Sequence, residues 1–300
     1  MSENAGTPLL ATLPGRLRDW ANAAIGPVGA FVPHELAAEP WPPAADDVPT
    51  VVLLDELATA MDDMIALGMP PVYAAGRLAV VLTLVAEQRR AEGPHLLVRA
   101  AGDDAASLCQ RLRAELALHG EPAAATPDLP ELRKPTGRLA TELVDGFLAP
   151  LQAYAQGAVQ ALLHWPRASF LTGFPHHETA PERIELVGPA RSLVYGPYLY
   201  LPTGWWEAEL RLYFSEEACR RTFNVEMIAE DSSIGIIRLK PTSSGIFHTR
   251  MMFHNPRADW PVSLRVVLEH GAIEGRMGLE GVTLRHSRSE ATIDKPYNVS

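Results

Sequence analysis

The segment GPYLYLPTGWWEAELRLYF, residues 196–214, decides how the second half of this chain folds. In its last ten residues the even positions, from Trp206 to Phe214, are all apolar, whereas the odd positions, from Trp205 to Tyr213, are charged or aromatic. Successive side chains of a β-strand point to opposite faces of a sheet. The segment therefore predicts a strand with one buried face and one polar, aromatic face.

The same alternation recurs in the segments that follow. Apolar positions alternate with polar ones near 222–229, 262–268 and 282–285, and further strands are expected near 184–187, 193–201, 234–239 and 246–253. Residues typical of turns separate these segments, as in AEDSSIG and KPTSSG. About eight short alternating strands predict an antiparallel β-sandwich or jelly roll over residues 184–287.

The first half has a different pattern. We expect an irregular arm rich in Pro and Ala over 1–49, a helical domain over 50–165, a linker over 166–183 and a tail over 288–300. Helices are predicted over 50–68, with Thr50 or Asp55 near the start, over 70–93 and over 102–120, and PHLLVRA (94–100) could be a short strand. A long helical pattern covers 136–164, with Pro150 as a kink or break. The predicted class is thus α+β multidomain: a mainly helical N-terminal half followed by an antiparallel β-sandwich.

Charge and composition exclude several functions. Residues 1–150 carry 11 basic and 20 acidic residues and residues 151–300 carry 15 and 16, so neither half offers the basic surface that nucleic acid requires. No apolar run is long enough to cross a membrane, so membrane insertion is not expected. The N-terminus shows no secretory signal, which predicts synthesis in the cytoplasm. Cys109 and Cys219 are expected to be free thiols.

The order of features in 184–286 resembles the galactose-binding-like jelly roll of many carbohydrate-binding modules. The resemblance is carried by LYLPTGWWEAELRLYF, in which Pro202 and Gly204 make the turn, and by FNVEMIAE, VSLRVVLEHG and MGLEGVTLRH. It covers about the last third of the chain and implies a carbohydrate ligand. Such modules often hold a structural calcium ion near the first strand, but no dense acidic loop accompanies Glu182 and Glu185, so no metal is assigned.

Sugar recognition uses flat apolar rings beside groups that form hydrogen bonds with hydroxyls. One expected surface is the odd-numbered face of 205–213. Tyr198 and Tyr200 would join this surface if their strand paired with 205–213 as a hairpin. The loops at one end of the sandwich are the other expected location. The candidate ligand-binding residues are Tyr198, Tyr200, Trp205, Glu207, Glu209, Arg211, Tyr213, Asn255, Arg257, Asp259 and Trp260. The alternative is that the helical half or a second subunit packs on the same face.

Other polar clusters predict little chemistry. His176, His177 and Glu178 are adjacent and lack a ligand pair at helical spacing, so a solvated linker is favoured over a metal site. Glu207 and Glu209 could serve a glycoside hydrolase as acid and base, although a charged exterior is the simpler interpretation. The chain has no nucleophile elbow, phosphate-binding loop or dinucleotide fingerprint. No cofactor and no catalytic residue is predicted.

Three hypotheses follow. In the first, the chain is a non-catalytic binder of a cell-surface or capsular polysaccharide, such as a receptor-binding spike or adhesin of a phage-like particle that lysis releases. Helix 136–164 would then serve a homo-oligomer or a larger assembly. In the second, the chain is a cytoplasmic enzyme or accessory subunit of polysaccharide biosynthesis. In the third, it is a structural protein whose aromatic face is an interface.

Overall fold

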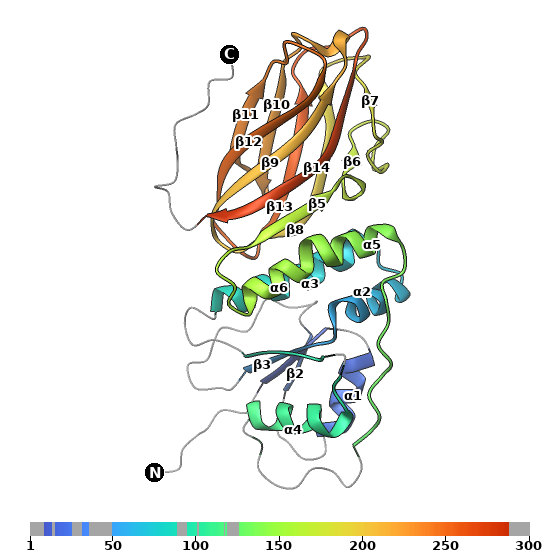
Figure 1. Ribbon diagram of the computed structural model, residues 1–300, viewed down its shortest axis with the longest axis vertical. Coiled ribbons are helices and arrows are strands. Elements are labelled where there is room, and N and C mark those ends of the chain that lie inside the picture. The colour runs from blue at the N-terminus through green and yellow to red at the C-terminus, as the bar shows by residue number, and fades with distance from the viewer. Residues whose placement is uncertain are drawn as a thin grey trace. The chain divides into compact units, whose positions relative to one another are not determined.

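The computed structural model describes residues 9–13, 16–25, 32–35, 50–88, 95–100, 102–116, 118 and 126–287. Contacts divide the chain into two compact units, Met1–Val144 and Asp145–Ser300, which we call unit 1 and unit 2. The expected tail 288–300 and most of the expected arm lie outside the described residues. The chain combines helices with antiparallel sheets, as the predicted α+β class requires (Figure 1).

Unit 1 contains a parallel sheet that the sequence analysis did not foresee. It has the order β2-β1-β3-β4, formed by β1 (Leu9–Thr12), β2 (Val32–Glu35), β3 (Thr50–Leu54) and β4 (His95–Val98). The expectation of an irregular arm is therefore wrong at β1 and β2. The helix expected to start near Thr50 or Asp55 begins at Leu57, so the first of these two starts is wrong. The strand expected in 94–100 is confirmed as β4.

The error at β3 has a physical reason. The sequence TVVLL has no polar alternation because the side chains of Val51, Val52, Leu53 and Leu54 are buried on both faces of the sheet, which is usual for a parallel strand. A continuous apolar run also fits a buried helix, so periodicity alone cannot separate the two.

Five helices are described in unit 1: α1 (Arg16–Ile25), α2 (Leu57–Ala66), α3 (Pro71–Gln88), α4 (Ala105–Glu115) and α5 (Arg138–Leu143). The helices predicted over 70–93 and 102–120 are confirmed as α3 and α4. Helix α4 begins where the carboxylate of Asp104 accepts a hydrogen bond from the Ser107 amide at 2.7 Å. Among the described residues, no helix is both long and apolar enough to cross a membrane.

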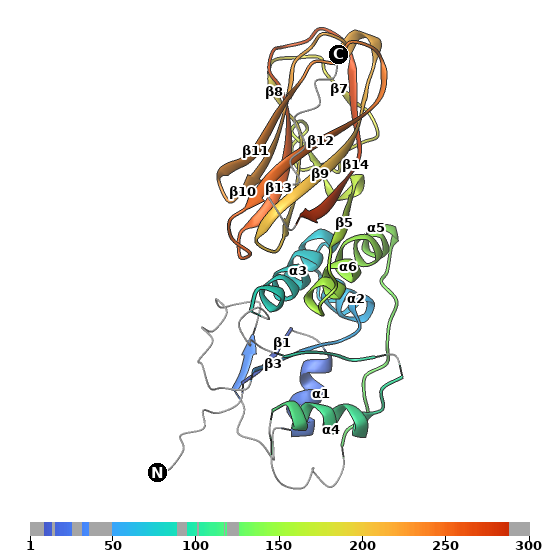
Figure 2. The ribbon, with the colours of Figure 1, turned by 60° about the vertical axis from the view of Figure 1, so that its left-hand side comes forward.

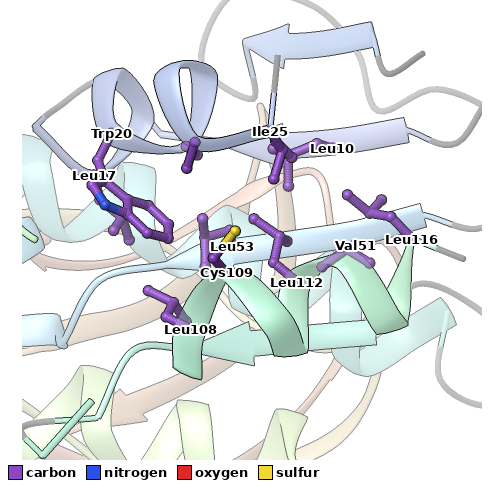
Figure 3. Packing of buried hydrophobic residues seen from close by; sticks show 12 residues of the cluster. Leu10, Leu17, Trp20, Ile25, Val51, Leu53, Leu108, Cys109, Leu112 and Leu116 are labelled. Carbon is purple, nitrogen blue, oxygen red and sulfur yellow. The ribbon is translucent and has the colours of Figure 1, made fainter. Parts of the chain in front are cut away.

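Helices cover both faces of the parallel sheet. On one face, α1 and α4 share a core with β1 and β3, in which Trp20 and Ile25 pack with Leu108 and Leu112 over Leu53 (Figure 3). On the other face α2 and α3 pack together, and α5 packs on α3 (Figure 2). Unit 1 is therefore a sheet between two helical layers.

The long helix predicted over 136–164 is right in part. Helical backbone runs from α5 through a π-helical turn, Val144–Leu148, to α6 (Ala149–Ala155), so that Pro150 lies in the first turn after the π-helix. The prediction is wrong beyond Ala155, because Gly157 adopts a φ of 111° and residues Leu162–Pro166 form strand β5.

Unit 2 consists mainly of two antiparallel five-stranded sheets. Sheet I has the order β11-β10-β13-β8-β6, and sheet II has the order β12-β9-β14-β5, with β7 paired to β14. The strands not yet given are β6 (Leu171–Thr172), β7 (Ile184–Glu185), β8 (Arg191–Tyr200), β9 (Gly204–Phe214), β10 (Phe223–Ala229), β11 (Ser232–Leu239), β12 (Gly245–Asn255), β13 (Pro261–Leu268) and β14 (Arg276–Ser287). Figures 1 and 2 show the sheets as two facing layers.

The core of unit 2 lies between these sheets. The even-numbered residues of β9 from Trp206 to Phe214 are all buried, as the alternation predicted, and so are Val225 on β10 and Leu264 on β13. Phe214 of sheet II meets Phe223 of sheet I with ring centroids 4.8 Å apart. Apolar burial of this kind supplies most of the free energy that holds two sheets together.

The LPTG turn, residues 201–204, carries the chain from sheet I to sheet II. Trp206 donates a hydrogen bond from Nε1 to the Pro202 carbonyl at 3.0 Å, and the buried Asn255 amide donates to the carbonyls of Leu201 and Pro202 at 2.7 and 3.3 Å. Gly204 has a φ of 124°, and a Cβ there would lie 3.0 Å from Nε2 of His286. The turn thus needs glycine for both conformation and space.

Candidate functional site

The odd-numbered residues of β9 form a row on the outer face of sheet II, and we call Trp205, Glu207, Glu209, Arg211 and Tyr213 the β9 row. All five lie on the side opposite the buried even positions and are partly or fully exposed. At about 3.4 Å per residue, the row spans about 27 Å from Trp205 to Tyr213. The structure therefore keeps together all five residues that the sequence placed on this face.

One end of the row is aromatic. Trp205 lies opposite His254 of β12, and the two rings meet edge to face, with centroids 5.2 Å apart and planes at 64°. His254 is exposed, and Trp205 is partly exposed. An indole held in this way by its neighbour offers an apolar ring surface beside a hydrogen-bonding imidazole.

The middle of the row is a network of charged groups. The two oxygens of Glu209 lie 3.2 Å from the Arg250 guanidinium and 3.4 Å from Nδ1 of His248, both on β12. Glu207 lies opposite Met252 on one side and opposite Arg285 of β14 on the other. The side chains of Arg250 and His248 are 64% and 57% exposed, so these groups are accessible to a ligand.

The far end of the row is closed by internal contacts. Arg211 forms an ion pair with Glu280 at 2.9 Å, and the guanidinium of Arg183 lies 3.9 Å from the centroid of the Tyr213 ring. One face of the Tyr213 ring is therefore covered by a guanidinium, whereas Trp205 is met by its neighbour His254 edge to face.

Tyr213 also lines an open cleft of about 620 Å³ at this end of unit 2. Four carboxylates and one guanidinium are among its lining groups: Glu185, Glu216, Glu217, Glu274 and Arg276. Arg276 pairs with Glu185 at 2.7 Å, which raises the pKa of Arg276, and a hydrogen bond from Ser215 lowers the pKa of Glu217. The cleft is therefore polar and predominantly acidic.

The hairpin that would have placed Tyr198 and Tyr200 beside Trp205 does not form. Strand β8 pairs with β13 and β6 in sheet I, whereas β9 pairs with β12 and β14 in sheet II. The reason is the LPTG turn, which crosses between the sheets instead of closing a hairpin. Tyr198 and Tyr200 therefore do not belong to the β9 row.

Tyr198 belongs instead to an aromatic array that the sequence analysis missed. Successive ring centroids lie 6.1–6.4 Å apart along the series Phe174, His176, His177, Tyr195 and Tyr198. The Tyr195 hydroxyl is 2.9 Å from Nδ1 of His177. Burial and the neighbouring Tyr195 raise the pKa of Tyr198, against the attraction of Arg265.

Strict alternation could not have found this array. His177 and Tyr198 both have positive φ, at 66° and 62°, which re-aims their rings relative to an ordinary strand. The local signal is the Gly196-Pro197 pair, which directly precedes Tyr198, the residue that the register with β13 skips. His176, His177 and Glu178 are exposed, and the described residues contain no group of three side chains arranged to hold a metal ion.

The predicted loop residues divide into two kinds. Asn255 is fully buried and serves the LPTG turn, so its assignment as a ligand contact is corrected to a structural role. Arg257 binds Asp259 through Nε at 2.9 Å and lies 4.9 Å from the centroid of the Trp260 ring. The bond to Arg257 lowers the pKa of Asp259 and raises that of Arg257. These three residues form a self-contained exposed cluster.

No protein-family model matches this chain, and no curated protein matches it. Among solved structures, the CBM36-1 domain of a multidomain xylanase from the hindgut metagenome of Trinervitermes trinervoides matches with a TM-score of 0.28 and 11% identity, over 41% of this chain and 95% of that one. The carbohydrate-binding module TmCBM61, solved with β-1,4-galactotriose, matches with a TM-score of 0.27 and 9% identity, over 43% and 90%.

An enzyme is among the similar structures as well. The Stig cyclase Fisc from Fischerella sp. TAU matches with a TM-score of 0.29 and 10% identity, over 42% of this chain and 85% of that one. Because all three TM-scores are far below 0.5, these likenesses decide neither the fold nor the function of this chain.

Proposed function

We propose that unit 2 is a jelly-roll domain of the carbohydrate-binding-module type and that it binds a glycan without catalysis. The β9 row carries this proposal, because it combines a partly exposed indole with carboxylates and guanidiniums along about 27 Å of one strand. Pyranose rings present apolar faces that pack on aromatic rings and hydroxyls that bond to charged side chains.

The contacts divide the row into parts with different tasks. Trp205 with His254 supplies the stacking surface, and the Glu209, Arg250 and His248 network supplies hydrogen-bonding groups already held in place. Groups fixed before binding lose less conformational entropy when a ligand arrives. Tyr213 is assigned a supporting role because Arg183 covers one face of its ring.

The charges favour a neutral glycan. On and beside the row, three carboxylates, Glu207, Glu209 and Glu280, are matched by three guanidiniums, Arg211, Arg250 and Arg285. The adjoining cleft is predominantly acidic, and residues 151–300 carry 15 basic and 16 acidic residues. This distribution offers a polyanionic glycan no net positive charge. A cell-surface or capsular origin of the glycan, and a place on a phage-like particle or in a homo-oligomer, stay predictions.

Binding of the full chain to a panel of neutral polysaccharides, measured by titration calorimetry, tests the proposal. We expect Trp205→Ala to weaken binding about tenfold or more, as truncation of a central aromatic contact does. Tyr198→Ala is the matched control, since it removes a partly exposed aromatic ring from sheet I and should change affinity by less than about twofold. Retained affinity in Trp205→Ala, with loss in Tyr198→Ala, would move the site to the aromatic array. Retention in both, or no binding to any neutral glycan, would overturn the proposal.

A further inference from the structure

The order of strands in unit 1 creates a crevice at one edge of its sheet. From β1 the chain continues into α1 on one face, and from β3 it continues into α2 on the opposite face. The two connections therefore leave the carboxyl ends of neighbouring parallel strands in opposite directions. In open α/β sheets, such a point is the usual place for a ligand.

A small, partly open cavity lies at this point, with a volume of about 20 Å³. Its lining comes from the ends of β1 and β3 and from the helices that follow them: Thr12, Leu13, Leu17, Arg18, Leu53, Leu54, Asp55, Ala60 and Asp63. A volume of this size holds one water molecule or one hydroxyl group. Only the tip of a larger ligand could enter it.

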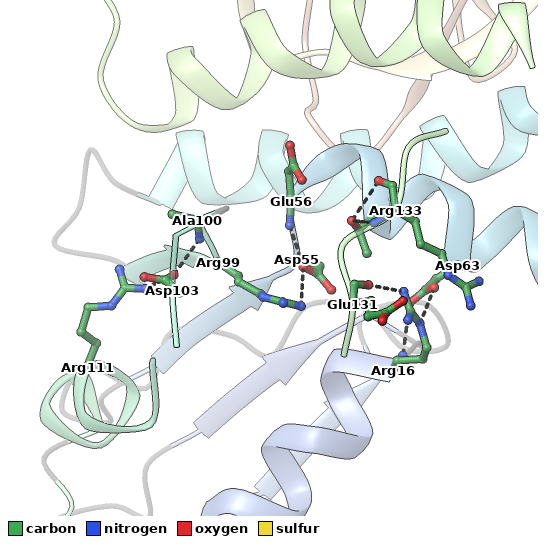
Figure 4. A network of polar contacts seen from close by, with 11 residues as sticks. Arg16, Asp55, Glu56, Asp63, Arg99, Ala100, Asp103, Arg111, Glu131 and Arg133 are labelled. Carbon is green, nitrogen blue, oxygen red and sulfur yellow. Dashed lines mark hydrogen bonds and ion pairs between the residues drawn. The ribbon is translucent and has the colours of Figure 1, made fainter. Parts of the chain in front are cut away.

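Asp55, the first residue after β3, has an unused hydrogen-bond acceptor. The residue is 5% exposed, and its Oδ1 accepts a hydrogen bond from the Glu56 amide at 2.9 Å and lies 3.5 Å from Nη1 of Arg99. Its Oδ2 is buried and has no hydrogen-bond partner within the described chain. In Figure 4 the carboxylate lies between Arg99 on one side and Arg16 and Asp63 on the other. A buried acceptor without a donor is unfavourable, because it has lost its hydrogen bonds to water and gained none in return.

The other carboxylate of the cavity is fully engaged. Asp63 accepts from Nε of Arg16 at 2.9 Å and from the Arg16 amide at 3.3 Å, and Arg16 also donates to the Glu131 carbonyl at 3.0 Å (Figure 4). Asp55 and Asp63 are thus each matched by an arginine, and Arg18 adds a further positive charge to the lining. Because each carboxylate already has an arginine partner, a neutral donor such as a hydroxyl group would complete the bonding of Oδ2 without adding charge to the cavity.

We propose that this cavity receives a hydroxyl group of a sugar-type ligand, which donates its hydrogen bond to Oδ2 of Asp55. The shared chemistry is that of a ribose or a pyranose, whose rings present neutral hydroxyl donors at their edges. The remainder of the sugar would lie outside the cavity, along the carboxyl edge of β1 and β3. This site belongs to unit 1 and does not depend on the glycan surface proposed for unit 2.

The test uses the full chain with uridine and methyl α-glucoside as separate probes, at up to about 10 mM, because single-hydroxyl recognition is weak. Saturation-transfer NMR detects such binding. Binding of uridine alone identifies ribose as the source of the hydroxyl, binding of the glucoside alone identifies a pyranose, and binding of both supports the shared chemistry. Absence of binding by both probes overturns the proposal and leaves a buried water as the partner of Asp55.

Variants decide whether bound probe occupies this cavity. Asp55→Asn preserves the shape of the side chain but puts an amide in place of one carboxylate oxygen, and it should weaken binding about tenfold. Asp103→Asn is the matched control, because Asp103 pairs with Arg111 and does not line the cavity. Ala60→Val fills the cavity without changing its charge, and it should weaken binding about tenfold as well. It serves as the second variant if Asp55→Asn does not fold. Unchanged binding in the folded variants overturns the proposal, and loss in Trp205→Ala alone would assign the probe to unit 2.

Discussion

The guanidinium of Arg183 lies 3.9 Å from the centroid of the Tyr213 ring and covers one of its faces. One face of the Tyr213 ring is therefore covered by another side chain of the same protein. Trp205 lies at the other end of the same strand face, where it meets His254 edge to face and is partly exposed. The two aromatic ends of the β9 row are not equivalent, although the sequence alternation treats them alike.

This difference predicts unequal effects on binding. We expect Tyr213→Ala to change the affinity for a neutral glycan by less than about threefold, compared with about tenfold for Trp205→Ala. Calorimetric titration of both variants with the same glycan measures the contrast. An equal or larger loss in Tyr213→Ala would show that the ligand displaces Arg183 and stacks on the tyrosine.

The Arg183–Tyr213 contact should instead contribute to stability. A double-mutant cycle of Arg183→Ala and Tyr213→Ala should give a coupling energy of about 0.5–1 kcal/mol, the usual size of a partly exposed cation–π pair. Urea denaturation of the four proteins provides the free energies of unfolding. A coupling energy of zero would mean that the stacked arrangement does not persist in solution.

Substitution of the buried Asn255 should cause a large loss of stability of unit 2. Asn255→Ala removes the amide that binds the carbonyls of Leu201 and Pro202, and we expect the free energy of unfolding of unit 2 to fall by about 2–3 kcal/mol. The control is Arg257→Ala, since Arg257 pairs with Asp259 at the surface and its loss should lower the free energy of unfolding much less. Urea denaturation that ranks the two variants in the opposite order would contradict the structural role of Asn255.

The balanced charges of the β9 row predict weak salt dependence. Affinity for a neutral glycan should change by less than about twofold between roughly 50 and 500 mM NaCl, because binding brings no net charge to the surface. Titrations at several ionic strengths measure this. A steep loss of affinity with added salt would instead indicate an anionic ligand held by Arg211, Arg250 and Arg285.

Asp55 predicts a specific pH dependence of stability. Burial raises the pKa of Asp55 above its ordinary 3.8, more than the attraction of Arg99 lowers it. A carboxyl that binds its proton more tightly in the folded state stabilises the fold at low pH, and this contribution is lost as pH rises above about 4. Asp55→Asn cannot titrate, so the stability of the natural protein relative to this variant should decrease from about pH 4 to pH 7.

Urea denaturation of both proteins across this pH range measures that difference. An increase with pH would show that the attraction of Arg99 dominates and that the pKa of Asp55 is lowered. A difference that does not vary with pH would place the titration of Asp55 outside the range.

The sequence predicted strands best where one face alone is buried. In β9, β10 and β13 the burial alternates with the pleat, so the apolar positions identify both the strand and its inner face. The same reasoning failed at β3, where both faces are buried and no alternation exists. It also failed for the pairing of β8 with β9, because adjacency in sequence does not fix which sheet a strand joins.

The candidate sites likewise divide into one that lies on a single strand and two that need distant segments to come together. The five residues of the β9 row share one strand, so their common face could be predicted from parity alone. The aromatic array needs two residues with positive φ, and the cavity beside Asp55 needs strands β1 and β3 to be neighbours. No local pattern contains that information, since it arises only when distant segments are brought together.

Strand β14 has a further consequence for how unit 2 is made. It is the last strand in the sequence, yet it lies between β9 and β5 and pairs with both. During synthesis on the ribosome, one edge of β9 therefore stays unpaired until the residues up to Ser287 have emerged. Open edges invite pairing with other chains. Any interruption of synthesis before β14 should therefore yield an aggregation-prone fragment and not a smaller folded domain.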